Sequence, residues 1–252
     1  MSFWSRLLGI PALGYKPCGR DSRDLACSVL LDRLGAASGT LAESIDLWRG
    51  YEPFDQKSTQ SCAGCSVAQG LRLAFAEDGR YVPPLSPLFL YYNARRDEAP
   101  AASGVTDDGT TFRSIMRGLT RLGVCPESRW PLESSAENSR PSWLAYRDAA
   151  DYRGLRGYYR CQSIDDIKRA LSARRPVVIG LSIDKDFIKT TGPTYVEDTP
   201  GGHGGHGMLL TGYDKQGRFH LVNSWGTRWR GGKILVGEAF VRRNQSAWAL
   251  DT

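Results

Sequence analysis

The stretch FDQKSTQSCAGCSVA at residues 54–68 leads directly into a helical pattern. Apolar residues recur every three or four positions over 63–75, and Asp78-Gly79 follows as a stop signal. Ser61 precedes the pattern and is the expected N-cap, so Cys62 is predicted to lie in the first helical turn. The positive potential of a helix N-terminus lowers the pKa of a thiol and favours the nucleophilic thiolate. Cys62 is therefore a candidate nucleophile.

Gln56 lies six residues before Cys62. A glutamine amide at that place is suited to donate a hydrogen bond to the oxyanion of an acyl transfer, with the Cys62 backbone N–H as second donor. The simpler interpretation of Cys62 and Cys65 is a pair of buried small apolar residues. A redox pair is less favoured, because thioredoxin-like chemistry expects a βαβ context that this chain does not show.

The run at 54–68 resembles the active-site segment of papain-like cysteine peptidases, particularly the bacterial branch, with its pattern D-Q-G-x-x-G-[SA]-C-T-x-x-A-x-A. This resemblance gives Gln56 the oxyanion-hole position and Cys62 the nucleophile position. Lys57 and Gln60 depart from the pattern, since the family usually has glycines there. A second alignment makes Cys65 the nucleophile, but it breaks the six-residue spacing from the glutamine, so Cys62 is preferred.

Two later segments continue the resemblance. Residues 206–214 are similar to the family's H-[AG]-x-x-x-x-G-Y-[DG] segment, and residues 223–226 match N-S-W-G. The resemblance implies that His206 is the acid and base, that Asn223 orients its ring through the side-chain oxygen, and that Trp225 covers this hydrogen bond. The Cys-His-Asn triad is a known variant of the Ser-His-Asp arrangement.

The resemblance extends over about residues 41–240. It includes the place where the family has a glycine-containing strip that pairs with the substrate backbone. In this chain the strip corresponds to Asp108, Gly109 and Thr110. These three residues are the candidate substrate-binding residues.

The two halves of the chain differ in pattern. Helices are predicted for 112–122, after a cap at Thr110 or Thr111, and from Ser163, where Asp166 completes a capping box. Strands are predicted for 177–183, 208–213, 218–224 and 233–240. The expected fold is therefore α+β. The resemblance implies a papain-like fold with a helical left lobe (about 51–150), an antiparallel β-barrel-like right lobe (about 151–252) and the active site in the cleft between them.

An N-terminal extension of residues 1–40 precedes the peptidase domain expected at 41–252. Residues 1–14 carry one positive charge and an apolar stretch broken by Pro11, which is unlike a secretory signal. We interpret them as part of the mature chain, in the cytoplasm or exported without a recognisable signal. From its length alone, we expect the tail Met1–Leu41 to cross the cleft and control activity.

Composition restricts the remaining classes of function. No apolar run approaches the roughly 20 residues of a membrane span. The net charge of +6 comes from 33 basic and 27 acidic residues in scattered clusters, which favours a solvated surface over a nucleic-acid site. Six cysteines in 252 residues are typical of reduced thiols rather than a disulfide scaffold. The expected partners are a peptide or protein substrate and, for this family, an inhibitor protein; no cofactor is expected.

Three alternatives to peptide hydrolysis stay open. The same triad supports acyl transfer or deamidation. Cys62, Cys65, His203 and His206 have the residue types of a Cys₂His₂ zinc site in a non-catalytic protein. A peptidase-shaped binding protein without activity is the third. The zinc site leaves Gln56 and the Asn-Ser-Trp-Gly motif unexplained, and peptide hydrolysis explains both.

Overall fold

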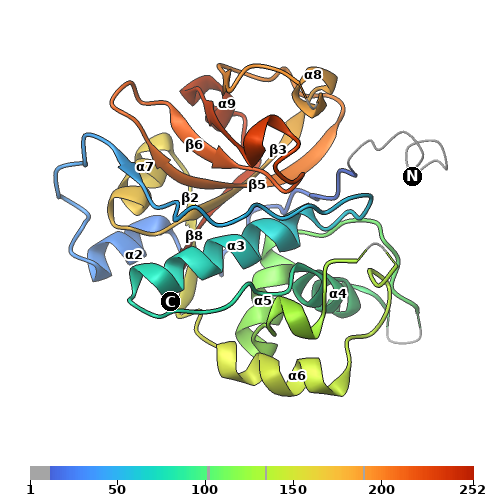
Figure 1. Ribbon diagram of the computed structural model, residues 1–252. Coiled ribbons are helices and arrows are strands. Elements are labelled where there is room, and N and C mark those ends of the chain that lie inside the picture. The colour runs from blue at the N-terminus through green and yellow to red at the C-terminus, as the bar shows by residue number, and fades with distance from the viewer. Residues whose placement is uncertain (1–11, 101–102, 134, 190) are drawn as a thin grey trace.

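A computed structural model describes residues 12–100, 103–133, 135–189 and 191–252. It has two lobes that meet along helix α3 (Cys62–Glu77), with a helical lobe on one side and a sheet lobe on the other (Figure 1). The α+β papain-like architecture expected from the sequence is confirmed. The predictions for residues 1–11, including the export signal, lie outside the described residues.

The helical lobe is built around α3, a helix of 16 residues that is buried over most of its length. Val67, Leu71 and Phe75 follow one another at four-residue spacing and are fully buried, as the sequence pattern predicts. The other elements of this lobe cover α3 from one side (Figure 1). They are α4 (Pro87–Glu98), α5 (Phe112–Leu122), α6 (Trp143–Ala149) and the short 3-10 helices η1 (Glu127–Arg129) and η2 (Ala150–Tyr152), beside α3 itself (Cys62–Glu77).

The sheet lobe has eight strands in the described part of the chain, in the path order β2-β8-β3-β5-β6-β7-β4, with β1 paired to β5. The strands are β1 (Ile45–Asp46), β2 (Gly157–Cys161), β3 (Val177–Ile183), β4 (Tyr195–Val196), β5 (Gly204–Tyr213), β6 (Phe219–Val222), β7 (Lys233–Val236) and β8 (Ser246–Asp251). The sheet is open rather than a closed barrel, and β4 pairs with β7 in parallel while the other pairs are antiparallel.

Both faces of this sheet are covered, because successive side chains of a strand point to opposite faces. In β3, Val177 and Ile179 belong to the core of the sheet lobe, whereas Val178 belongs to the core around α3. In β5, Met208 likewise belongs to the core of the sheet lobe and Leu209 to the core around α3. The outer face carries α7 (Ile164–Ser172) and α2 (Cys27–Arg33), and α8 (Lys185–Ile188), α9 (Glu238–Arg242) and η3 (Arg230–Gly232) complete the lobe.

Most local predictions agree with the structure. Thr111 caps α5 and Ser163 forms a capping box with Asp166. Two predictions were wrong in detail. Ser61 precedes α3 but its side chain does not cap the helix, because its hydroxyl bonds the Thr59 hydroxyl instead. The strand predicted for 233–240 ends at Val236, and the chain turns into α9 after Gly237.

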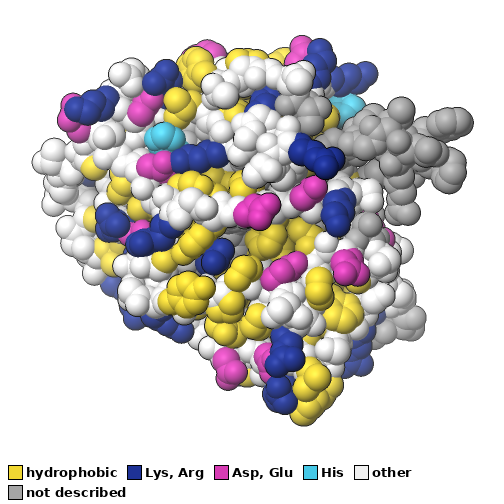
Figure 2. Space-filling model, in the orientation of Figure 1, with side chains coloured by type: hydrophobic (Ala, Val, Ile, Leu, Met, Phe, Trp, Pro, Cys, Tyr) yellow, Lys and Arg dark blue, Asp and Glu magenta, His cyan; other side chains and the backbone are white. Residues whose placement is uncertain are grey.

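The remaining composition-based expectations concern thiols, membranes and charge. All six cysteines are free and buried. Among the described residues no helix is long and apolar enough to cross a bilayer. Figure 2 shows Lys and Arg side chains interspersed with Asp and Glu over the visible face, so basic residues form no single patch on that face.

From α2 onward, the N-terminal extension predicted at residues 1–40 packs onto the sheet lobe. Leu30 and Leu31 of α2 are buried in the sheet-lobe core. Arg33, the last residue of α2, pairs with the carboxylate of Asp251, which also accepts from Arg175 Nε at 2.8 Å. Asp251 is fully buried, so these two guanidinium groups supply the opposite charge that its burial requires.

Substitution of Asp251 by Asn is predicted to lower the free energy of unfolding by about 3 kcal/mol, because it removes the buried charge shared by Arg33 and Arg175 and leaves Arg175 only its pair with Asp78. Asp97→Asn is the matched control, since its ion pair with Arg121 is partly exposed, and it should cost less than about 1 kcal/mol. Urea unfolding of both variants measures the difference. Equal losses would contradict the role assigned to the buried pair.

Candidate active site

Cys62 lies at the point where the sheet lobe touches the first turn of α3. The Gly207 backbone N–H donates to Cys62 Sγ at 3.4 Å, which places the sulfur beside the residue that follows His206. A Cβ on Gly207 would lie 3.1 Å from the Ala63 Cα atom, so the approach of β5 to α3 leaves little room for a side chain there. Cys65 lies elsewhere: its sulfur is 3.8 Å from the Ser61 hydroxyl.

His206 and Asn223 are brought together because β5, which carries His206, pairs with β6, and Asn223 directly follows the last residue of β6. His206 Nε2 and Asn223 Oδ1 are 2.7 Å apart. The Trp225 ring stacks on the imidazole with centroids 4.4 Å apart and planes at 23°, and so covers this hydrogen bond. His206 Nδ1 is buried and has no hydrogen-bond partner among the described residues. This arrangement leaves one ring nitrogen fixed and the other available.

Gln56 is held in one orientation by three hydrogen bonds. Its Oε1 accepts from the Ser224 hydroxyl at 2.6 Å. The Ser224 hydroxyl thus shows which atom of the amide is the oxygen. The amide nitrogen points the opposite way and donates to the Thr59 carbonyl at 2.7 Å and to the Ala12 carbonyl at 2.9 Å. The amide thus presents a donor to a carbonyl from a distant part of the chain.

The two departures from the family pattern lie next to Gln56. Lys57 adopts φ of 52°, the left-handed conformation that glycine favours. The lysine therefore takes the glycine-like backbone of the family at a cost of roughly 1 to 2 kcal/mol. Gln60 instead uses its side chain and backbone N–H to bind Asp107, which directly precedes the predicted substrate-binding residues 108–110.

The strip formed by Asp108, Gly109 and Thr110 is paired with the N-terminal tail. The Thr110 N–H donates to the Gly14 carbonyl at 2.9 Å, and the Thr110 carbonyl accepts from the Lys16 N–H at 2.9 Å. Asp108 is exposed and pairs with the Lys16 ammonium at 3.1 Å. Gly109 has φ of 83°, and a Cβ on it would lie 2.2 Å from the Gly14 carbonyl oxygen.

Two supporting residues were missed by the sequence analysis. The Tyr91 hydroxyl donates to Asp107 at 2.7 Å and accepts from the Gly109 N–H at 2.9 Å, so it fixes the shape of the strip. Ser224 fixes Gln56, as described above. Ser224 stood inside the Asn-Ser-Trp-Gly motif, which was a usable signal. Tyr91 carried no such signal, because its role depends on a contact between α4 and a distant loop.

Burial disfavours the charged forms of both candidate reacting groups. It raises the pKa of the Cys62 thiol, although backbone N–H groups, first that of Gly207 and then that of Gly14, act in the opposite direction. Burial also lowers the pKa of His206 to about 4, and the Asn223 hydrogen bond opposes that shift. Burial therefore favours the neutral forms of both the Cys62 sulfur and the His206 imidazole.

The zinc alternative is not supported by the geometry. Among the described residues no group of three or more His, Cys, Asp or Glu side chains could hold a metal ion. His203 is exposed on the loop before β5, whereas His206 is buried and bonded to Asn223. The four zinc candidates of the sequence do not come together.

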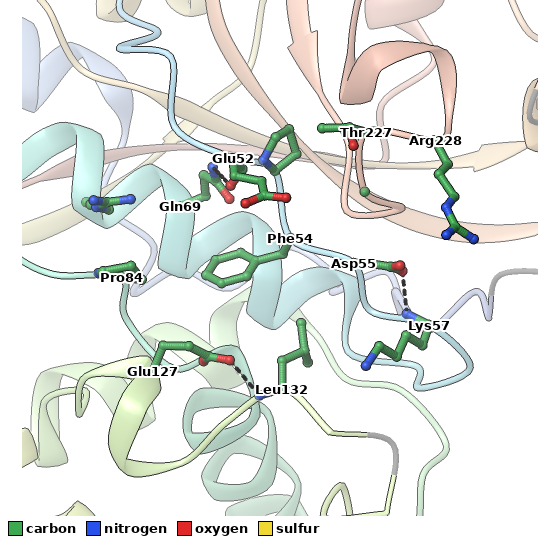
Figure 3. A pocket seen from close by; sticks show the side chains of 13 residues that line it. Glu52, Phe54, Asp55, Lys57, Gln69, Pro84, Glu127, Leu132, Thr227 and Arg228 are labelled. Atoms are coloured by element: carbon green, nitrogen blue, oxygen red, sulfur yellow. Dashed lines mark hydrogen bonds between the residues drawn. The ribbon is translucent and has the colours of Figure 1, made fainter.

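A pocket of about 660 Å³ lies beside this region but not at it (Figure 3). Its lining includes Phe54, Asp55 and Glu127, and neither Cys62 nor His206 takes part. Burial raises the pKa of Glu127 to about 7, and one of its carboxylate oxygens accepts from the Leu132 N–H at 2.6 Å. The tail residues Ala12, Gly14 and Lys16 instead form hydrogen bonds with Gln56 and Thr110.

Protonation of His206 is predicted to destabilise the folded protein. Its folded pKa of about 4 lies below the ordinary 6.5, so between these pH values the unfolded chain binds a proton that the folded chain does not. The stability that depends on neutral His206 is fully present above pH 6.5 and is lost as the pH falls towards 4. Urea unfolding at pH 7.5 and 4.5 should show a loss of about 2 to 3 kcal/mol that is absent from His206→Gln.

His203→Gln is the matched control, because the His203 ring is exposed, and it should keep the pH dependence of the wild type. The same pH dependence in His206→Gln as in the wild type would show that the buried imidazole does not titrate in this way.

Comparison with known proteins agrees with the geometry. A family model described as "Peptidase_C39 like family" matches residues 50–238. The structure is similar to that of xylellain, a cysteine protease from Xylella fastidiosa, with 27% identity, a TM-score of 0.80 and coverage of 95% of this chain and 96% of that chain. The digestive procathepsin L 3 of Tenebrio molitor, 19% identical, shares the fold with a TM-score of 0.69 and coverage of 95% and 84%.

Two curated proteins are also similar. An uncharacterized peptidase C1-like protein of Acanthamoeba polyphaga mimivirus is 27% identical over 208 residues, which cover 75% of this chain and 65% of the viral protein. A cathepsin L-like proteinase of Fasciola hepatica is 27% identical over 127 residues, 48% of this chain and 37% of the proteinase. The aligned part is thus just under two thirds of the viral relative. Family and fold together show that this chain belongs to the Peptidase_C39 like family, within the papain-like cysteine peptidases.

Proposed function

We propose that the protein hydrolyses peptide bonds through a thioester on Cys62, with His206 as acid and base. The observation that carries this proposal is the state of the His206 ring: Nε2 is fixed by Asn223, and Nδ1 is buried without a partner in the described structure. The Cys62 sulfur lies against Gly207, the next residue along β5. A ring held at one nitrogen and free at the other is what a thiol nucleophile requires of its base.

The proposed reaction uses each of these groups. The Cys62 thiol gives its proton to His206, the sulfur attacks the carbonyl carbon, and the C–N bond breaks as the imidazolium returns the proton to the leaving amine. Water then attacks the thioester and gives its proton to His206, the C–S bond breaks to release the acid, and the imidazolium returns the proton to the Cys62 sulfur. Asn223 keeps the ring in the tautomer and orientation that this exchange needs, and Trp225 keeps water away from their hydrogen bond.

Gln56 is proposed as an oxyanion donor. Its amide nitrogen already donates to a carbonyl oxygen, that of Ala12, at 2.9 Å. The Cys62 N–H is the second proposed donor, since the first N–H groups of a helix have no partner within the helix. The Ala12 carbonyl thus stands where we expect the carbonyl oxygen of a substrate.

Residues 12–16 are proposed to block the cleft in the resting protein. The Tyr15 N–H donates to the Gly205 carbonyl at 3.2 Å, while Gly14 and Lys16 pair with Thr110 on the opposite lobe. The segment therefore spans both lobes directly over Cys62, which is fully buried. Burial in turn disfavours the thiolate and imidazolium forms, so the tail acts by exclusion of substrate and by desolvation of the reacting pair.

Gly14→Val in the full chain is predicted to raise peptidase turnover by about 5- to 150-fold. Any Cβ at this position would lie 1.9 Å from the Gln60 carbonyl oxygen, so the segment must move, at about 1 to 3 kcal/mol. Gly19→Val is the control, since nothing lies within 4 Å of a Cβ there. Hydrolysis of a denatured protein substrate compares the variants, and equal rates for both would argue against a blocking tail.

Cys62→Ala in the Gly14→Val chain is predicted to reduce turnover at least about 1,000-fold, because the nucleophile is lost. Cys65→Ala should stay within about threefold of the parent, since its sulfur lies by Ser61. Alkylation by iodoacetamide, mapped by peptide mass spectrometry, should mark Cys62 ahead of the other thiols. Loss of turnover in Cys65→Ala with retention in Cys62→Ala would transfer the nucleophile role to Cys65.

A further inference from the structure

Tyr15 fills a side-chain pocket between the lobes. Tyr15 is 4% exposed, and the centroid of its ring lies 5.2 Å from that of Phe112, the first residue of α5. On the other side, a Cβ on Gly180 would lie 2.2 Å from the Tyr15 ring carbons, so the ring rests directly on the backbone of β3. The pocket is as deep as a tyrosine because Gly180 has no side chain.

The pocket ends in a hydroxyl. The Tyr15 phenol oxygen and Ser246 Oγ are 2.7 Å apart, and both residues are buried. Ser246 begins β8, where it pairs with Gly180 of β3, so it is held at the floor by the sheet itself. Among the described residues Tyr15 is the hydrogen-bond partner that the structure gives to this hydroxyl. A ring without a phenol group would leave the Ser246 hydroxyl buried and unpaired.

The segment that carries Tyr15 follows the path proposed for the substrate. Its backbone pairs with Thr110 of the substrate strip and with Gly205, and three residues earlier the Ala12 carbonyl meets Gln56. A side chain at the place of Tyr15 is therefore a few residues from the carbonyl that meets Gln56 and Cys62. A peptide that replaces the tail along this path would present a side chain to the same pocket.

We infer that the pocket formed by Gly180, Phe112, Gly205 and Ser246 makes the enzyme selective for peptides with a tyrosine near the cleaved bond, read through the Ser246 hydroxyl. This rests on the proposed peptidase function. A site built to bond a buried hydroxyl rejects the analogue without it more strongly than an apolar pocket distinguishes one methylene. Tyrosine should therefore be preferred to phenylalanine by about 5- to 150-fold in kcat/KM.

Cleavage-site profiling of a denatured protein mixture with the Gly14→Val chain tests this, together with kcat/KM for peptide pairs that differ only as Tyr or Phe. Tyrosine should be enriched at one fixed position within about three residues of the cut. Ser246→Ala should bring the Tyr-to-Phe ratio close to one, and Gly180→Ala should shift selection to side chains smaller than either. Ser139→Ala, on an exposed loop, should leave the ratio unchanged. Equal use of Tyr and Phe by the parent would overturn the inference.

A second measurement needs no turnover. Tyr15→Phe in the otherwise unchanged chain should weaken the tail and raise the rate of Cys62 alkylation by about 5- to 150-fold, whereas Tyr81→Phe, at an exposed site, should not. If Tyr15→Phe accelerates alkylation but no variant cleaves peptides, the proposed function fails and the hydroxyl-reading pocket stands. If peptides are cleaved but neither Tyr15→Phe nor Ser246→Ala has an effect, the pocket inference fails alone.

Discussion

The contact between Gly207 of β5 and the first turn of α3 determines the rest of the site. The N–H of Gly207 reaches Cys62 Sγ at 3.4 Å, and a side chain there would meet the backbone of Ala63. Because β5 lies between β3 and β6, this contact also fixes where His206, Gly180 and Asn223 lie relative to the helix. The catalytic candidates therefore come from segments far apart in sequence but joined by one strand-to-helix packing surface. A shift of that packing by an ångström would separate the sulfur from the ring nitrogen proposed to serve it.

The close packing of β5 on α3 also explains why the charged forms of Cys62 and His206 are disfavoured in the resting site. A thiolate and an imidazolium attract one another, but burial removes the water that would solvate either charge. The positive end of α3 and the surrounding N–H groups favour the thiolate only partly, since the net effect on Cys62 is a raised pKa. We therefore expect the ion pair to form when the tail leaves and water or substrate enters. In this view the extension controls both access and protonation state.

The sequence was most informative where the signal was local. The N-terminal position of Cys62 on α3, the cap of Thr111 and the box of Ser163 with Asp166 each depend on a few neighbouring residues, and the structure has all of these features. Strand β7 was predicted too long because the apolar Ala239 and Phe240 follow it closely, whereas Gly237 ends the strand and Glu238 begins a helix. The open sheet path and the β8 strand beside β3 involve long-range pairing, which no local pattern specifies.

The pocket for Tyr15 lay beyond the sequence for the same reason. Tyr15 and Ser246 are separated by 231 positions, and the glycine that makes room for the ring is on a third segment. Nothing around Gly180 distinguishes it from a glycine in an ordinary buried strand. Tail length alone led to the expectation that the extension would cross the cleft. The contacts that make such a crossing specific appear only once Gln56, Thr110 and Gly205 are seen on the two sides of one segment.

The tether of this segment sets how strong its contacts need to be. Residues 12–16 are joined through a short connection to α2, which is anchored in the sheet lobe by Leu30, Leu31 and the pair of Arg33 with Asp251. A tethered ligand of this kind acts at an effective concentration on the order of millimolar. Even an intrinsic dissociation constant near 1 μM would then keep the cleft closed by about 4 kcal/mol. Loss of a single contact worth 1 to 3 kcal/mol moves such a balance by one or two orders of magnitude without any need to unfold the domain. On the proposed function, a modest set of hydrogen bonds, rather than a large inhibitory domain, would be enough to hold the cleft closed and would still let a substrate with the right side chain compete for the pocket.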